Sequence, residues 1–215
     1  MLLSGRCEVF GLEGGGGHGF VVRDTEDVLI SVVGRPGRDA IEEAVAREWE
    51  GDVLITPPEN EAYMSAALPG WKAVSATLHL LGDAPRLPRV PADAMRLLAP
   101  SELAAIDRLP PDLLAEFRVA YSPIVASLAD GRPVSFCYAA AQTETLWDIS
   151  IDTLEGFRNQ GYAARCVAYM VERMEGRGLR PVWGAEEWNR ASLGLAAKLG
   201  FVPVDSLLVF RPASN

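Results

Sequence analysis

The stretch that decides the fold is residues 146–174, which read LWDISIDTLEGFRNQGYAARCVAYMVERM. Apolar and polar residues alternate over 146–153, and this is the period of a strand that places Asp148, Ser150 and Asp152 on one face. From about Gly161 to 175, apolar residues recur at helical spacing. We therefore predict a strand, a short glycine-containing turn and a helix in direct succession.

The turn between this strand and this helix has the composition of an anion site. The first amides of a helix have no intrahelical acceptor, and the helix dipole adds about half a positive charge there. Gly161 would let a phosphate approach the main chain because glycine has no Cβ. Arg158 would add charge-assisted hydrogen bonds. The residues alone leave a plainer alternative open, in which Gly161 only makes the turn and Arg158 is a solvated charge.

The rest of the chain is predicted to mix strands and helices in the manner of an α+β protein with a mixed sheet. The expected strands are 28–34, 52–56, 71–81, 94–100, 133–141, 181–185 and 201–210. The expected helices are 38–49, a short one after Asn60, 101–108, 111–129 with an interruption at Pro123, and 190–199.

A proline-rich connector at residues 83–93 divides the chain, since proline removes backbone donors and favours extended conformations. We expect a small α/β N-terminal domain over residues 1–85 and a second domain over 86–215. Residues 57–80 and 186–210 share an order of asparagine, short apolar helix, glycine-aromatic pair and strand. This similarity favours an N-terminal domain that is a degenerate half-copy of the second, and we expect it to act as a lid on the acceptor side.

The amino-acid composition disfavours several classes of function. The 215 residues carry a formal charge of −9, which disfavours non-specific binding to nucleic acid or to an anionic membrane. No apolar stretch approaches the roughly 18 residues of a membrane span. The three cysteines lie far apart, without the spacing of a metal site, so we expect reduced thiols, no metal and a cytoplasmic location. Whether the protein forms a homo-oligomer is left open.

A glycine run at residues 11–20, GLEGGGGHGF, formally contains the G-x-G-x-x-G motif of dinucleotide-binding proteins. That motif has to lie between a strand and a helix, so that the pyrophosphate meets the helix N-terminus. The residues that follow, from Phe20 onward, have the pattern of a strand. We therefore interpret the run as a flexible loop or a wide hairpin.

Two signatures resemble those of the GNAT N-acetyltransferase superfamily over residues 93–215. The first is T-x-E-x-x-R-x-x-G-x-A over 153–163, which is similar to the pyrophosphate loop of that superfamily. The second is Asn189-x-x-Ser192, followed by a helix that ends in Gly-Phe at 200–201. The resemblance implies a GNAT-like mixed, mostly antiparallel sheet flanked by helices. It also implies direct transfer of an acetyl group from acetyl-CoA to a small primary amine.

The resemblance assigns cofactor contacts to several positions. Main-chain groups of Ile151, Asp152 and Thr153 would pair with the pantetheine and donate to the thioester oxygen. Asn189 would reach the pantetheine arm and Ser192 the same channel, although the position of Asn189 fits a helix N-cap equally well. The diphosphate would lie on the backbone of Arg158, Asn159, Gln160, Gly161, Tyr162 and Ala163.

An amine must lose a proton to react, so a carboxylate with a suitable pKa is expected as general base. Asp148 is the first candidate because it lies on the strand that reaches the thioester; Asp152, Glu144 and Glu186 are alternatives. Many relatives carry a tyrosine as general acid where this chain has Ala196. This departure motivates an alternative function, namely a non-catalytic acyl-CoA-binding sensor or interaction module.

Overall fold

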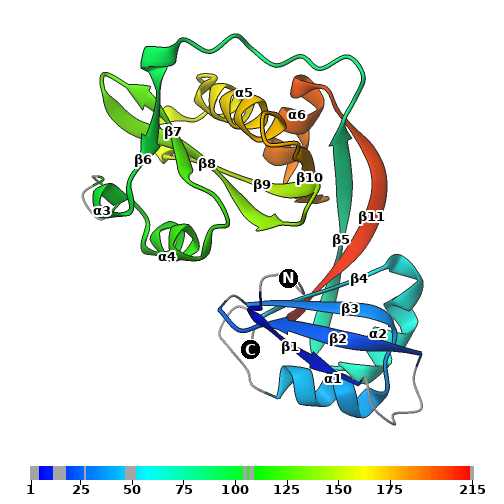
Figure 1. Ribbon diagram of the computed structural model, residues 1–215. Helices are drawn as coiled ribbons and strands as arrows, with labels where there is room; N and C mark the ends of the chain where they lie inside the picture. Colours follow the sequence, from blue (N-terminus) through cyan, green and yellow to red (C-terminus); the bar gives the residue numbers. More distant parts are fainter. Residues whose placement is uncertain are drawn as a thin grey trace. The chain divides into compact units, whose positions relative to one another are not determined.

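The computed structural model describes residues 5–11, 18–26, 28–46, 52–103, 106 and 109–213 (Figure 1). The chain forms two compact units, each described here by itself. Unit 1 takes the residues up to Leu78 together with 185–189 and the chain from 204 onward, and unit 2 takes 79–184 and 190–203. Two segments that we placed in the second domain therefore belong to unit 1. None of the helices in the described ranges is long and apolar enough to cross a bilayer.

Unit 2 is built on a mixed sheet with the strand order β6-β7-β8-β9-β10. Neighbouring strands from β6 to β9 are antiparallel, whereas β9 and β10 are parallel because a helix, α5, connects them. This arrangement confirms the predicted fold class. The strands are β6 Met95–Leu98, β7 Ile124–Ala129, β8 Arg132–Gln142, β9 Leu146–Thr153 and β10 Arg180–Glu186; the helices are α3 Pro100–Leu103, α4 Pro111–Val119, α5 Tyr162–Glu175 and α6 Arg190–Leu199, with short 3-10 turns η2 at Ala92–Ala94 and η3 at Glu155–Phe157.

Helix α5 packs on β7, β8 and β9 and covers one face of the sheet (Figure 1). Its buried stripe includes Cys166, Val167, Met170 and Met174, which recur at the helical spacing expected for this segment. Burial raises the pKa of the Cys166 thiol to about 12, so this side chain packs as a small apolar group.

Helix α4 packs against side chains of β8 that alternate with those facing α5. Phe117 of α4 contacts the rings of Phe136 and Tyr138, at centroid distances of 5.3 and 5.2 Å. Successive side chains of a strand point to opposite faces. Thus the face of β8 that carries Phe136 and Tyr138 meets α4, and the face that carries Cys137 meets α5.

The predicted helix over 111–129 is wrong in its second half. Helix α4 ends at Val119, and residues 124–129 form strand β7 between β6 and β8. The segment IVASLA is a short apolar run whose periodicity fits a buried strand as well as a helix. Of the helix expected at 101–108, α3 covers the beginning, and most of 104–108 lies outside the described residues.

Unit 1 has the strand order β1-β2-β3-β4-β11. Residues 12–17, which hold most of the glycine run, lie outside the described residues, but the run leads into a strand, as predicted. The elements are β1 Cys7–Phe10, β2 His18–Asp24, β3 Leu29–Arg35, α1 Arg38–Val45, β4 Val53–Thr56, η1 Pro58–Asn60, α2 Glu61–Ala67 and the larger parts of β5 Trp71–Leu81 and β11 Phe201–Pro212. Residues 208–210 of β11 pair with β4.

The two units share a succession of strands and helices. In unit 1, β2 and β3 are antiparallel, and α1 connects β3 to the parallel strand β4. In unit 2, β8 and β9 are antiparallel, and α5 connects β9 to the parallel strand β10. The order and direction of these strands are therefore the same in the two units.

A buried ion pair joins β2 to the segment before β4. The guanidinium of Arg23 donates to both carboxylate oxygens of Asp52, with a shortest distance of 2.9 Å, and to the Ala44 carbonyl at 2.8 Å. The two side chains are only 3% and 2% exposed. Because both charges are removed from water, each depends on the other for compensation.

We expect Asp52→Ala to destabilise the protein by about 3–5 kcal/mol, because it leaves the Arg23 guanidinium buried without its counter-charge. Urea unfolding followed by circular dichroism measures the loss. Glu42→Ala is the matched control, since it breaks the exposed pair between Arg38 and Glu42, which is worth about 0.5 kcal/mol. Equal losses in the two variants would contradict this account of the pair.

Candidate functional site

Strands β9 and β10 run side by side only where they begin. Residues Leu146–Asp148 pair with Arg180–Val182, and the ladder shows no further pair over the described residues of the two strands. On its other edge, β9 stays paired with β8 as far as Thr153. The second half of β9 therefore has one edge in the sheet and one edge without a ladder partner.

The hydrogen bonds show which peptide groups lie on that open edge. The Leu154 amide donates to the Val134 carbonyl of β8 at 2.9 Å, so even-numbered residues of β9 direct their peptide groups toward β8. The peptide groups of Ile151 and Thr153 then point the other way, and the Thr153 carbonyl accepts a bond from Arg158 Nε at 3.2 Å. Asp152, which we predicted to pair through its main chain, has its peptide groups toward β8.

The turn after β9 is exposed from Arg158 to Gly161. Asn159 and Gly161 have left-handed backbones, with φ of 60° and 82°. Glycine tolerates this conformation best. In the part of the chain that the structure describes, no atom outside the immediate neighbours lies within 4 Å of the place where a Cβ on Gly161 would stand. The space in front of Gly161 is thus open to a ligand.

Helix α5 begins directly after this glycine. Its first intrahelical bond runs from the Arg165 amide to the Gly161 carbonyl, at 3.2 Å, and among the described residues no side chain caps its N-terminus. The amides at the start of α5 therefore keep their donors for another partner. Gln160 Nε2 donates to the Gly156 carbonyl at 3.1 Å and steadies the loop. These residues fit an anionic group such as a diphosphate.

Asp148 stands where the ladder between β9 and β10 ends, opposite Val182. Its half-buried carboxylate accepts backbone bonds from the amides of Gly184 and Ile149. Burial raises the pKa of Asp148 to about 6, although these two bonds lower it. A carboxylate with this pKa is ionised at neutral pH and is close enough to neutrality to exchange protons.

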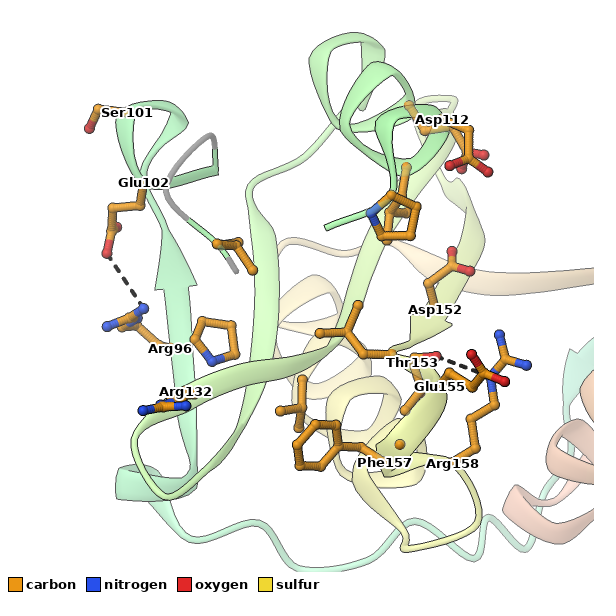
Figure 2. A pocket seen from close by; sticks show the side chains of 18 residues that line it. Arg96, Ser101, Glu102, Asp112, Arg132, Asp152, Thr153, Glu155, Phe157 and Arg158 are labelled. Carbon is orange, nitrogen blue, oxygen red and sulfur yellow. Dashed lines mark hydrogen bonds and ion pairs between the residues drawn. The ribbon is translucent and has the colours of Figure 1, made fainter. Parts of the chain in front are cut away.

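A cavity of about 1330 Å³ lies beside α3, α4 and the end of β9 (Figure 2). Figure 2 shows Asp112 and Asp152 at one end of the cavity and Arg96 and Arg132 at the other. Burial raises the pKa of Asp152 to about 6, and the charges of Glu116 and Asp112 raise it further, while Arg158 lowers it.

Tyr138, a buried residue of β8, has its hydroxyl bonded to Glu116, which lines this cavity. It donates a hydrogen bond to the carboxylate of Glu116, and it also bonds with the hydroxyl of Ser150. Burial, followed by the bond to Glu116, raises the pKa of Tyr138 well above its usual range. Sequence reasoning missed Tyr138 and Glu116, because they are 22 residues apart and no motif joins them.

The two polar residues of the second signature, Asn189 and Ser192, lie at the start of α6. Ser192 Oγ accepts a bond of 2.9 Å from Trp183 Nε1. Asn189 directly precedes α6, and its amide donates to the Glu186 carbonyl at 2.9 Å. Asn189 belongs to unit 1 and Ser192 to unit 2. The position of Asn189 before α6 is that of an N-cap residue, as the sequence allowed.

The alternative bases differ from Asp148 in their surroundings. Glu186 forms an ion pair with Arg211 at 2.6 Å and accepts from Trp188 Nε1 at 2.7 Å. Burial alone would raise the pKa of Glu186, but these two partners lower it overall. Glu144 is exposed in the turn before β9. Ala196, at the position of the tyrosine of many relatives, is fully buried.

Over the ranges that the structure describes, no group of three or more His, Cys, Asp or Glu side chains is placed to hold a metal ion.

Comparison with solved structures shows the same fold in proteins of low sequence identity. A GCN5-related N-acetyltransferase-like protein from Streptococcus suis has a TM-score of 0.69 at 19% identity, with 96% of this chain and 88% of that chain covered. A protein described as an acetyltransferase from the GNAT family of Novosphingobium aromaticivorans has a TM-score of 0.63 at 17% identity, with 95% and 92% covered.

A tandem GNAT protein from the clavulanic acid biosynthesis pathway is also similar, with a TM-score of 0.52 at 14% identity over 93% of this chain and 79% of that chain. Curated proteins give no significant match to the sequence. The family model for GNAT acetyltransferases matches residues 125–210, from β7 to β11, and includes the turn and helix N-terminus described above. Over this part the chain is similar to GNAT acetyltransferases, and its fold is the one seen in solved GNAT proteins.

Proposed function

We propose that this protein is an N-acetyltransferase that moves an acetyl group from acetyl-CoA to a primary amine by direct transfer. The observation that carries the proposal is the exposed turn from Arg158 to Gly161, beside the open edge of β9 and the uncapped start of α5. A nucleotide diphosphate is the ligand for which such a set of backbone donors is suited.

In this proposal the first signature binds the cofactor mainly through its backbone. The amides of Gly161, Tyr162 and Ala163 donate to the diphosphate, and the exposed Arg158 adds charge. Asn159 and Gln160 shape the loop, through its left-handed backbone and through the bond of Gln160 to Gly156. The absence of a Cβ on Gly161 leaves room for the phosphate oxygens.

The open edge of β9 is proposed to bind the pantetheine as an added strand. Ile151 and Thr153 offer their peptide groups there, whereas Asp152 contributes its side chain. Asn189 and Ser192 are kept as proposed contacts of the pantetheine channel on the basis of the resemblance alone.

Acetyl-CoA supplies, when bound, a thioester that is reactive toward a neutral amine. We propose that Asp148 takes the proton that the amine must lose, because its ionised form predominates at neutral pH. The amides of Gly184 and Ile149 hold its carboxylate in one orientation. Asp148 also lies on the same strand as the residues proposed for the pantetheine, so that base and thioester share one rigid element.

A second candidate function is a non-catalytic acyl-CoA sensor. It is favoured by Ala196, which is fully buried and offers no acid for the departing thiolate. Thiol release with a panel of amines separates the two candidates: an enzyme releases CoA with at least one amine, and a sensor binds the cofactor without releasing it.

Unit 1 is proposed to be a half-copy of unit 2. The shared order and direction of their strands supports this, and a similar structure belongs to a protein that is itself called tandem. The proposed role of unit 1 as a lid on the acceptor side rests on the sequence alone.

Gly161→Asp is expected to weaken acetyl-CoA binding on the order of 100-fold, because it places a carboxylate and a Cβ where the diphosphate is proposed to lie. Each tenfold loss of affinity corresponds to about 1.4 kcal/mol of binding free energy. Isothermal titration calorimetry measures the affinity. Gly178→Asp is the matched control: Gly178 also has an open left-handed backbone, with φ of 77°, but it follows the other end of α5. Unchanged binding in Gly161→Asp would remove the turn from the site.

Asp148→Asn is expected to lower kcat by about 10²–10⁴-fold, the usual contribution of a general base, while acetyl-CoA still binds. The active form of a base is the deprotonated one, so wild-type activity should rise as the pH increases through about 6. This limb should be absent in the variant. Asp130→Asn, in an exposed turn, is the control. A pH profile that keeps its limb in Asp148→Asn would assign the base elsewhere.

A further inference from the structure

The peptide group between Trp183 and Gly184 is the part of β10 that contacts the proposed base. Its amide donates to the carboxylate of Asp148, which also accepts from the Ile149 amide. The ladder between β9 and β10 ends where Asp148 stands opposite Val182. Gly184 is two residues beyond Val182, so its amide lies past the last pair of that ladder. The side chain of Asp148 therefore takes up an amide at the point where the two strands separate.

A buried histidine contacts the other side of the same peptide group. His79 lies on β5, in the part of that strand that belongs to unit 2, and is 7% exposed. Its Nδ1 is 3.2 Å from the Trp183 carbonyl oxygen. Because a carbonyl only accepts, Nδ1 is assigned as the donor. In a trans peptide the carbonyl and the amide point in opposite directions, so His79 and Asp148 hold this peptide from its two sides.

The side chain of Trp183 fixes the residue but not the rotation of the peptide that follows it. Trp183 is 1% exposed, its Nε1 donates to Ser192 Oγ at 2.9 Å, and its ring centroid lies 5.2 Å from that of Phe201. Rotation about the ψ angle of Trp183 remains a soft backbone motion. Such a rotation would turn the Gly184 amide away from Asp148, and the hydrogen bond from His79 opposes it.

The bond from His79 also acts on the strength of the bond to Asp148. Hydrogen bonds in a chain polarise one another, by about 10–30% per bond. A donor on the Trp183 carbonyl makes the Gly184 amide a stronger donor, and a stronger donor stabilises the ionised carboxyl. Burial and two backbone amides shift the pKa of Asp148, and over the described residues no charged side chain adds to them. Its acidity therefore depends on how these amides are held.

We propose that His79 is a positioning residue for Asp148 and acts through the Trp183–Gly184 peptide. It donates to the carbonyl, keeps the amide directed at the carboxylate and so favours the ionised form of Asp148. The importance of this for acetyl transfer rests on the proposed function. His79 precedes the proline-rich connector, so a residue that we expected in a separate N-terminal domain takes part in the setting of the proposed base.

Two substitutions of His79 differ in whether they keep the donor. The amide nitrogen of asparagine is as many bonds from Cα as Nδ1 of histidine, so His79→Asn should keep the bond to the Trp183 carbonyl. His79→Leu is apolar and has no donor. In His79→Leu we expect the pKa of Asp148 to rise, because the Gly184 amide no longer supports the ionised carboxylate as well. Carbon-13 NMR titration of the aspartate carboxyl groups measures this without any substrate, and Asp148→Asn assigns the signal.

The pH profile of acetyl transfer should change in the same way. In the wild type, activity at pH 6 should be about half of that at pH 8, because Asp148 has a pKa of about 6 and acts in its ionised form. His79→Leu should lower this ratio at least about twofold, and His79→Asn should leave it unchanged. His18→Leu is the matched control, since His18 is the other histidine of the chain and is exposed. It should change neither the pKa nor the ratio.

The NMR and activity results separate the two proposals. Equal pKa values of Asp148 in the wild type and in His79→Leu would overturn the inference, and so would an equal rise in His79→Leu and His79→Asn, which would indicate a packing role. A rise in His79→Leu alone, without acetyl transfer by the wild type, would support the inference and overturn the enzymatic function.

Thermal melting followed by circular dichroism checks that each variant is folded. If His79→Leu does not fold, His79→Gln takes its place. The amide nitrogen of glutamine is one bond farther from Cα, in the position of Nε2, so this variant should also raise the pKa of Asp148. An unchanged pKa in a folded His79→Gln would then overturn the inference.

Discussion

The structure of this site depends on backbone donors and acceptors that, among the described residues, have no partner in a strand ladder or a helix cap. The pairing of β9 with β10 ends at Asp148. The chain then passes through Gly161, which has a left-handed backbone, into α5, and no described side chain caps the N-terminus of this helix. Unpaired backbone groups are tolerated where water or a ligand can reach them. The second half of β9 and the first residues of α5 are half-buried, and the turn between them is exposed from Arg158 to Gly161. Their backbone groups are suited to an extended anionic ligand.

The same geometry controls the acidity of the carboxylates on the face of β9. Asp148 lies where the two strands separate and Asp152 lies near the charges of α4; both are half-buried, and burial raises the pKa of each to about 6. Burial is the main cause for both residues, but the amides of Gly184 and Ile149 lower the pKa of Asp148, whereas the charges of Glu116 and Asp112 raise the pKa of Asp152 further.

The sequence predicts the strand, turn and helix of the candidate site better than it predicts the elements around them. The alternation over 146–153 and the glycine at 161 are local signals, and the strand, turn and helix that they predict are all present. Strand β7 was missed because a short apolar run has no period of its own, and only its neighbours on both sides make it a strand.

Local sequence patterns also do not predict contacts between residues that are far apart in the sequence. Tyr138 meets Glu116 through the packing of α4 on β8, and Arg23 meets Asp52 across 29 residues, so neither pair leaves a mark in the local sequence. Likewise, alternation along β9 predicts its faces but not its edges. The direction of the Asp152 peptide groups became clear only from the bond between Leu154 and Val134.

Hydrogen–deuterium exchange with and without acetyl-CoA tests the central claim most directly, because it reports on the backbone amides themselves. The account predicts that saturating acetyl-CoA slows exchange at residues 158–164 and along the open edge of β9. The corresponding turn of unit 1, at residues 35–39, should exchange as before. Saturated binding that leaves residues 158–164 unprotected would contradict the account.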